Sequence, residues 1–194
     1  MIISTLNDLR WVINYERKRY GYRPINSWLG WMIQDILFFL HPGNPCFFMY
    51  CLRCEEFFLY RNKSFLVRVL RAKHKHLQTT TGIELFPGCA ELGVTINHGK
   101  CVISQSAKIG RDCVILSDVT IGGTGGMRDS GAATIGNRVF VGSGARIIGQ
   151  ITIADEVVIG ANAVVVKDIF ESAITVAGVP AKKIKDRGSR EYIP

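Results

Sequence analysis

A histidine and a carboxylate near the middle of the chain have the residue types needed for acid–base chemistry. His98 stands in the motif Thr-Ile-Asn-His-Gly, and Glu84, fourteen residues earlier, stands in Gly-Ile-Glu-Leu-Phe-Pro-Gly. A hydroxyl group is a poor nucleophile until its proton is removed in the transition state, and a neutral imidazole can remove that proton. The imidazole needs a partner that orients its other ring nitrogen, and a carboxylate suits this role. The alternative for His98 is a surface histidine at a turn.

The cysteines and the other histidines predict no metal site. Cys51 and Cys54 form a C-x-x-C, which could be a redox pair or half of a zinc site, but no second C-x-x-C or histidine pair at ligand spacing completes it. The pair lies in an apolar helical pattern, so we expect buried, reduced thiols. His74 and His76 are two residues apart and do not share a helix face. Reduced cysteines are typical of cytoplasmic proteins, and we expect a cytoplasmic protein that requires no metal.

The element that must position His98 is a repeat of six residues in the second half of the chain. A period of six fits neither the 3.6 of a helix nor the alternation of a half-buried strand. It fits a β-solenoid, in which each rung places one large aliphatic and one small residue inside and stacked coils bury them together. An ordinary β-sandwich is the alternative. The aliphatic positions are Ile103, Ile109, Ile115, Ile121, Ile135, Val141, Ile147, Ile153, Ile159 and Val165. The small or β-branched positions are Ala107, Cys113, Val119, Val139, Ala145, Ile151, Val157 and Ala163.

The repeat loses its phase once. Ile121 and Ile135 are fourteen residues apart, two more than two rungs. The segment Gly123–Thr134 contains Gly-Thr-Gly-Gly and several polar residues, a composition that cannot pack a rung. We therefore expect it to leave the solenoid wall as a loop, and loops on rigid scaffolds are where functional sites are often built.

The first part of the chain is basic and helical in pattern. Residues 1–80 carry twelve Lys and Arg against five Asp and Glu, whereas the remaining residues carry twelve against eleven. No zinc-finger, helix-turn-helix or RNA-binding motif accompanies this charge, so we expect no nucleic-acid partner. The expected helices are Thr5–Tyr20 with Ser4 as its cap, Trp28–Leu40, Pro45–Tyr60, and a fourth that begins at Ser64.

The predicted organisation is a helical domain over 1–80, a β-solenoid over 81–180 and a basic C-terminal tail over 181–194. No stretch is long and apolar enough to span a bilayer. The basic amphipathic character of the third and fourth helices allows a weak peripheral membrane contact. The alternative is a helical cap that packs on itself and on neighbouring subunits while its Lys and Arg stay solvated.

Four motifs, in their order and spacing, resemble one known family. They are Gly-Ile-Glu-x-x-Pro-Gly at 82–88, Ile-x-His-Gly at 96–99, Val-Thr-Ile-Gly-Gly-Thr-Gly at 119–125 and Ala-Gly-Val-Pro-Ala-Lys at 177–182. In these motifs the chain is similar to the serine acetyltransferases of the hexapeptide-repeat acyltransferase superfamily. The resemblance covers about residues 80–185 and is weaker over the helical part.

The resemblance implies a fold and a reaction. The fold is a mainly β, left-handed parallel β-helix with an N-terminal α-helical cap, three rungs to a coil, assembled as a homotrimer whose active sites lie between neighbouring prisms. The reaction is transfer of acetyl from acetyl-CoA to a hydroxyl of a small-molecule acceptor. His98 matches the catalytic histidine of the family and Glu84 the carboxylate that orients it. Thioester attack creates an oxyanion, which backbone N–H groups of Gly122 and Gly123 could hold.

The resemblance also implies a CoA site near the last coils. The residues that match positions contacting the pantetheine arm are Ser143, Ala161, Val166 and Lys167. Lys182 and Lys185 match basic residues near the nucleotide phosphates, where Lys acts as a point charge. The alternative for these two lysines is a charged tail that keeps the protein soluble.

The chain departs from the family where the amino-acid acceptor would bind. Asn97 replaces an Asp that helps to hold the serine ammonium, and Gly131-Ala132-Ala133 replaces an Arg-His-Pro that holds its carboxylate. Each lost charge-assisted contact is worth roughly 1.5–3 kcal/mol. Arg128 lies in the same loop and could replace one of them. Asp35, with the His-Pro-Gly after it, resembles the helical domain of the family.

These observations predict an acetyl-CoA-dependent O-acetyltransferase of serine acetyltransferase type, with His98 as general base. The acceptor is L-serine or a related hydroxyl compound. One alternative is an O-acetyltransferase that acts on a sugar hydroxyl in surface polysaccharide biosynthesis. A second alternative, from another class, is a non-catalytic β-helix scaffold, which the retention of His98 with Glu84 disfavours.

Overall fold

A computed structural model describes residues 3–27, 30, 44–125 and 131–193. The chain divides into two compact units, Met1–Ile83 and Glu84–Pro194. The described helices are α1 (Leu6–Arg19), α3 (Pro45–Tyr60), α4 (Ser64–Thr81) and the short 3-10 helix η1 (Ser189–Glu191). The strands are β1 (Ile83–Glu84), β2 (Thr95–Ile96), β3 (Cys101–Ile103), β4 (Lys108–Ile109), β5 (Val114–Ile115), β6 (Val119–Gly122), β7 (Thr134–Ile135), β8 (Phe140–Val141), β9 (Arg146–Ile148), β10 (Thr152–Ile153), β11 (Val158–Ile159), β12 (Val164–Val165), β13 (Thr175–Ala177) and β14 (Lys182–Lys185).

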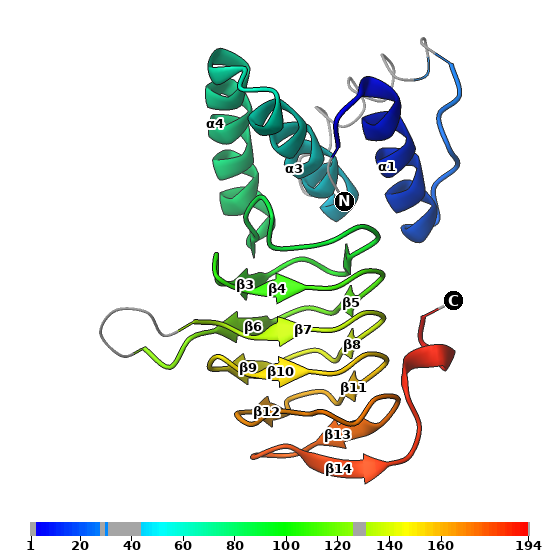
Figure 1. Cartoon of the computed structure of the whole chain (residues 1–194), viewed down its shortest axis with the longest axis vertical. Helices are drawn as coiled ribbons and strands as arrows, with labels where there is room; N and C mark the ends of the chain where they lie inside the picture. Colours follow the sequence, from blue (N-terminus) through cyan, green and yellow to red (C-terminus); the bar gives the residue numbers. More distant parts are fainter. Residues whose placement is uncertain (1–2, 28–29, 31–43, 126–130, 194) are drawn as a thin grey trace. The chain divides into compact units, whose positions relative to one another are not determined.

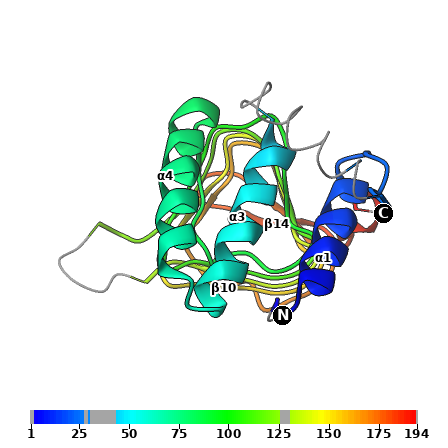
Figure 2. The ribbon, with the colours of Figure 1, turned by 90° about the horizontal axis from the view of Figure 1, so that it is seen from above.

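The strands of the second unit form three sheets that successive coils visit in turn (Figure 1). A five-stranded sheet has the order β1-β3-β6-β9-β12, a three-stranded sheet the order β10-β7-β4, and a six-stranded sheet the order β14-β13-β11-β8-β5-β2. Pairing is parallel except between β13 and β14. Seen from above, the coils lie one behind another (Figure 2). The predicted left-handed parallel β-helix with N-terminal helices is confirmed.

The positions predicted to point inward are buried. Each of the ten repeated aliphatic residues is at most 2% exposed, from Ile103 to Val165. The small or β-branched residues two places before them are buried as well, and all six cysteines of the chain are buried and free. The prediction of buried thiols at Cys51 and Cys54 is therefore confirmed. The solenoid core is a column in which each aliphatic residue contacts those of the coils above and below.

Glycine follows several of these aliphatic residues because neighbouring coils approach closely there. A Cβ atom on Gly142 would lie 2.6 Å from the backbone nitrogen of Ala161, and one on Gly110 would lie 2.6 Å from the carbonyl oxygen of Gly136. Gly122 differs, because the nearest atom to its Cβ position is the side-chain Cγ2 of Thr120 at 4.0 Å. Coil stacking therefore requires the glycine of the Ile-Gly pattern at Gly110 and Gly142 but not at Gly122.

Substitution of Gly142 by Ala is expected to lower the free energy of unfolding by about 1–3 kcal/mol, because the added methyl group must push two backbone segments apart. Urea denaturation followed by circular dichroism measures this change. Gly122→Ala is the matched control, since its methyl group meets open space, and should change stability by less than about 0.5 kcal/mol. Equal stabilities of the two variants would show that coil stacking does not require the glycine.

The predicted phase break coincides with an insertion in one turn. Ile103 pairs with Ile121 in the next coil, and Ile109 pairs with Ile135. The coil from Ile109 to Ile135 contains the break and is longer than the coil from Ile103 to Ile121. The chain leaves the stacked coils after β6 and returns at β7 (Figure 1). The predicted loop over Gly123–Thr134 is confirmed at its two ends, except that Thr134 already belongs to β7; residues 126–130, among them Arg128, lie outside the described residues.

The helical unit agrees with the predicted helices in its described parts, with one correction. The N-cap of α1 is Thr5, not Ser4: the Thr5 hydroxyl accepts from the Asp8 backbone N–H, and the Asp8 carboxylate accepts from the Thr5 N–H at 2.8 Å. Ser4 donates to the same carboxylate through its own N–H and hydroxyl, and these bonds together lower the pKa of Asp8. The predicted helix Trp28–Leu40, with Asp35, lies outside the described residues.

One buried ion pair and one buried carboxylate–histidine contact lie inside the described part of the helical unit. Arg53 of α3 donates through Nε and Nη2 to Oε1 of Glu16 in α1, at 2.9 and 2.7 Å. Burial alone would lower the pKa of Arg53, but the carboxylates of Glu16 and Glu56 raise it. On the other side of α3, Glu55 lies 2.7 Å from Nδ1 of His74 in α4. These pairs join each neighbouring helix to α3.

The C-terminal segment packs on the β-helix. Lys182–Lys185 forms β14, and the chain after it places Ser189 and Ile193 in fully buried positions. Nη2 of Arg138 donates to the Ile193 carbonyl at 3.0 Å, and the ring of Tyr192 lies 4.8 Å from that of Phe140, centroid to centroid. Among the described residues, no helix has the length and apolarity needed to cross a membrane.

Candidate active site

The five-stranded sheet has two edges, and predicted site residues lie along both. We call the turns that lead into its strands the entry edge, which comprises residues 97–100, 116–118, 142–145 and 160–163. The segments that follow its strands form the exit edge, which comprises residues 104–107, 123–125, 149–151 and 166–168. Hydrogen bonds between successive coils hold the entry edge in register, because Asp118 N donates to Lys100 O, Gly144 N to Ser117 O, and Asn162 N to Ser143 O.

His98 lies at the entry edge in a turn that has one residue more than its counterparts when the coils are aligned by their strand pairing, because Ile96 and Ile103 are seven residues apart and the equivalent pairs are six apart. The pair Ile96 and Ile115 is one residue further apart in the sequence than the pair Cys101 and Val119 of the next strand. The extra residue lies in the turn between β2 and β3, and His98, Gly99 and Lys100 all have positive φ, at 71°, 66° and 47°. The residues just before the next strands, Asp118 and Asn162, also have positive φ, at 59° and 56°, so positive φ at Lys100 is the ordinary corner conformation, whereas three such residues in a row distinguish the His98 turn. The imidazole of His98 is exposed.

Glu84 lies in the same sheet, as the last residue of its first strand. It belongs to β1, which neighbours β3 in the sheet, and the His98 turn leads directly into β3. Burial, and next the negative charge of Glu84, raise the pKa of the Cys101 thiol to about 12, which places the carboxylate near the first residue of β3. Both side chains, those of Glu84 and His98, are exposed. No hydrogen bond joins Glu84 to His98 in the described part of the chain.

The residues predicted to bind the pantetheine arm divide between the two edges. Ser143 and Ala161 lie at the entry edge, in the same row of turns as His98. Gly122 ends β6 and Gly123 follows it, while Val166 and Lys167 follow β12, so these four lie at the exit edge. Val166 and Lys167 are exposed. The structure therefore brings the predicted residues to one sheet but not into one pocket of the single chain.

The two lysines predicted near the CoA phosphates lie on the last hairpin. Lys182 pairs with Ala177 and Lys185 with Thr175 across β13 and β14, and both lysines are exposed. Lys183 between them differs, because hydrogen bonds from its ammonium group to Asp186 and Glu171 raise its pKa. Neither Lys182 nor Lys185 has a carboxylate partner among the residues that the structure describes.

The acceptor-binding residues are only partly described. Asn97 precedes His98 in the long turn, is half-buried, and donates its backbone N–H to Ile115 O at 2.8 Å. Arg128 and Asp35 lie outside the described residues. Ala132 and Ala133 are buried where the chain rejoins the β-helix, and the Ala132 N–H donates to the Ser106 hydroxyl at 3.1 Å. These two positions offer no charge to an amino-acid acceptor.

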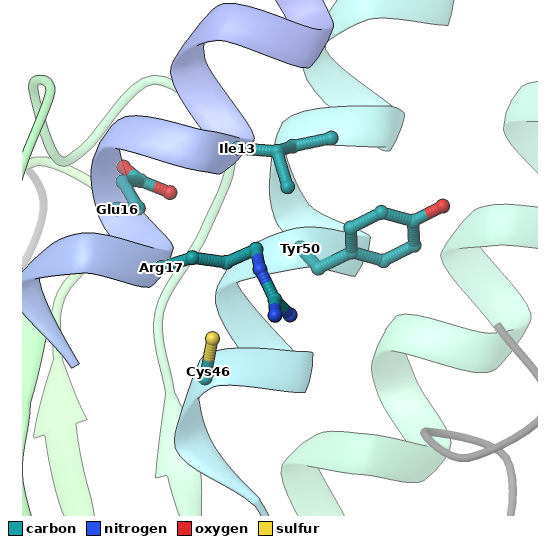
Figure 3. A pocket seen from close by; sticks show the side chains of 5 residues that line it. All are labelled: Ile13, Glu16, Arg17, Cys46 and Tyr50. Atoms are coloured by element: carbon teal, nitrogen blue, oxygen red, sulfur yellow. The ribbon is translucent and has the colours of Figure 1, made fainter. Parts of the chain in front are cut away.

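A small cavity lies in the helical unit, and none of the predicted site residues named above lines it (Figure 3). It is lined by Ile13, Glu16, Arg17, Cys46 and Tyr50. Glu16 is bound to Arg53, and Arg17 donates to the Arg23 carbonyl through Nε and Nη2. Burial raises the pKa of the Cys46 thiol to about 12, so this cysteine is not an activated nucleophile. The described residues also contain no cluster of His, Cys, Asp and Glu able to hold a metal.

The second half of the chain is similar to known transferases in sequence. A family model described as bacterial transferase hexapeptide (six repeats) matches residues 132–167. A serine acetyltransferase of Helicobacter pylori is 39% identical over 111 residues, which are 56% of this chain and 62% of that protein. The chain thus spans about three fifths of the length of this relative.

Solved structures of serine acetyltransferases share the fold. The soybean serine acetyltransferase apoenzyme superposes with a TM-score of 0.70 at 24% identity, over 91% of this chain and 69% of that one. A serine acetyltransferase in complex with CoA superposes with a TM-score of 0.58 at 26% identity, over 72% and 56% of the two chains. Together with the coil geometry, these similarities show the hexapeptide-repeat β-helix fold, and in its four motifs the chain is similar to the serine acetyltransferases.

Proposed function

We propose that this protein transfers the acetyl group of acetyl-CoA to a hydroxyl group, with the site built around the entry edge of the five-stranded sheet. The observation that carries the proposal is the lengthened turn at His98. A β-helix coil gains no packing from an extra residue, and the turns that end at Asp118 and Asn162 have one residue with positive φ each, whereas the His98 turn has three, of which His98 is not a glycine. An exposed imidazole held in such a turn is available to a substrate.

His98 is the proposed general base. The acceptor oxygen attacks the thioester carbonyl while the imidazole takes the hydroxyl proton, and the imidazolium then gives this proton to the departing CoA sulfur. Glu84 is the proposed positioning residue for the imidazole, and its place on the strand beside β3 supports this role. The backbone N–H groups of Gly122 and Gly123 are the proposed donors to the tetrahedral oxyanion.

Acetyl-CoA is the proposed acyl donor, with Ser143, Ala161, Val166 and Lys167 along the pantetheine arm. Their division between two edges supports a trimer, because the exit edge of one β-helix can face the entry edge of the next and complete the site. The relative solved with CoA supports the donor. The six free, buried cysteines fit a reducing compartment, and we propose the cytoplasm.

Replacement of Lys182 and Lys185 by Gln is expected to raise the KM for acetyl-CoA by roughly tenfold or more, because a charge-assisted contact to phosphate is worth about 1.5–3 kcal/mol. The value of kcat should change little, since the lysines do not touch the reacting atoms. Initial rates at varied acetyl-CoA measure both constants. Lys183→Gln is the matched control, because this lysine is already engaged by two carboxylates. An unchanged KM in the double variant would leave these residues as solubilising charges.

L-serine is the first candidate acceptor, because the similar proteins named above are serine acetyltransferases. A sugar hydroxyl is the second. The buried Ala132 and Ala133, and the amide of Asn97 in place of a carboxylate, favour it, because an acceptor without an ammonium or carboxylate group needs no charged clamp.

The acceptor is tested by incubating the purified protein with acetyl-CoA and either serine or a panel of sugars and sugar nucleotides, with the acetylated product identified by mass spectrometry. A product from serine supports the first candidate, and a product from a sugar alone supports the second. If no acceptor is acetylated, and His98→Ala behaves like the wild type, the non-catalytic scaffold replaces both.

A further inference from the structure

Helix α4 has an apolar stripe that its own unit does not bury. Val67, His74 and Leu77 form the inner stripe and are buried. Phe65 and Val69 lie one turn apart on the opposite side and are 75% and 52% exposed. Amphipathic helices normally expose polar side chains on that side. The outer stripe therefore does not stabilise the helical unit.

The exposed apolar surface continues around the turn that joins α3 to α4. Leu59 and Tyr60 end α3 and are 40% and 58% exposed, and Leu66, in the first turn of α4, is 40% exposed. We call the set of Leu59, Tyr60, Phe65, Leu66 and Val69 the hairpin patch. Several exposed large apolar residues at the end of one helix and the start of the next are typical of an interaction surface.

The charge around the hairpin patch has one sign. No Asp or Glu occurs from Phe57 to Ile83, while six Lys or Arg do. Arg71 is engaged by Glu55, and the Lys73 ammonium lies 4.8 Å from the centroid of the Phe47 ring. Arg61 lies 5.3 Å from the centroid of the Phe57 ring and donates to the Ser4 carbonyl. The remaining basic residues are Lys63, Arg68 and Lys75, which are exposed and have no carboxylate partner in the described part of the chain.

We propose that the hairpin patch docks this protein on a bilayer that contains anionic lipids. A membrane surface uses both properties of the patch at once: aromatic and aliphatic side chains enter the boundary between headgroups and acyl chains, and Lys and Arg attract anionic headgroups. A second copy of the same surface would bring like charges together, and nucleic acid would leave Phe65 and Val69 unused. Docking would hold the protein beside acceptors carried on lipids. The proposal concerns binding and does not depend on acetyl transfer.

The test is co-sedimentation of the full chain with vesicles of phosphatidylglycerol and phosphatidylcholine in equal parts, compared with phosphatidylcholine alone. The wild type should bind the mixed vesicles, bind the neutral vesicles at least tenfold more weakly, and be released by 1 M salt, where the Debye length is about 3 Å. Phe65→Ser with Val69→Ser, and separately Arg68→Gln with Lys75→Gln, should each weaken binding about tenfold or more.

Two controls match these variants. Phe170→Ser removes an aromatic residue of equal exposure, 77%, from the other unit, and Lys108→Gln with Arg111→Gln removes two exposed charges there. Both should bind vesicles as the wild type does. Wild-type protein that stays in the supernatant would overturn the proposal, and a change of oligomeric state in the Phe65 and Val69 variant alone would assign the patch to self-association. If only the Arg68 and Lys75 variant binds vesicles more weakly, the proposal that apolar side chains insert into the bilayer is overturned.

Discussion

Replacing His98 by Ala is expected to lower kcat for acetyl transfer by about 10²–10⁴-fold, the usual contribution of a general base. Without the imidazole, the acceptor hydroxyl must lose its proton to water while it attacks the thioester. The KM for acetyl-CoA should stay within a few-fold, because the proposed pantetheine contacts lie on other coils. Initial rates of CoA release at varied acetyl-CoA measure both effects.

His76→Ala is the matched control for this variant. His76 is also exposed, but it lies on α4 and in the other unit. Its removal should leave kcat unchanged. A His98→Ala enzyme that turns over as fast as the His76→Ala enzyme would remove His98 from the reaction and leave its long turn without a catalytic purpose.

Replacing Arg53 by Met is expected to lower the free energy of unfolding by about 3–5 kcal/mol, because it removes the guanidinium whose Nε and Nη2 groups bind the buried carboxylate of Glu16. Glu16 is 3% exposed and Arg53 4% exposed, so water cannot replace the lost contact. Chemical denaturation, followed by circular dichroism in the helical region, measures the change.

Arg71→Met is the matched control for the buried pair. Arg71 also binds a buried carboxylate, that of Glu55, but its own side chain is 64% exposed and His74 remains as a second partner. Loss of such a pair costs about 0–1 kcal/mol. If the two variants are equally stable, the Glu16–Arg53 contact does not hold α1 to α3.

The β-helix could be predicted from the sequence because its rule is local. Each rung needs one aliphatic and one small residue at fixed positions. The spacing of residues such as Ile103 and Ala107 in the sequence therefore predicts that their side chains are buried. The insertion between Ile121 and Ile135 could be predicted for the same reason, since any extra residue shifts the phase. Helix limits are predictable where proline or glycine marks them, as at Pro45.

The lengthened turn at His98 has a signal in the sequence that lies just before the regular repeat. Ile96 precedes Ile103 by seven positions rather than six, which indicates one extra residue. The signal is weak because Ile96 stands before the regular run of the repeat, inside the His98 motif. The cap of α1 is Thr5 instead of the predicted Ser4 because both residues have side chains able to cap, and only the backbone conformation distinguishes them.

Contacts between elements could not be predicted from the pattern. His74 carries no sequence signal that it binds Glu55, because the two residues lie on different helices. The packing of Ile193 and Tyr192 on the β-helix has no periodicity either. The same holds for the two edges of the five-stranded sheet, because their residues come from successive coils and meet only when the coils stack.

The central claim is that this chain is an acetyl-CoA-dependent O-acetyltransferase whose reaction depends on the His98 turn. Its most direct test is CoA release by the purified wild-type protein in the presence of acetyl-CoA, with and without a hydroxyl acceptor. The account predicts release that requires an acceptor, yields one acetylated product for each CoA, and falls by at least about 10²-fold in His98→Ala. Acceptor-dependent release that persists unchanged in His98→Ala, or no release with serine or any sugar acceptor, would contradict it.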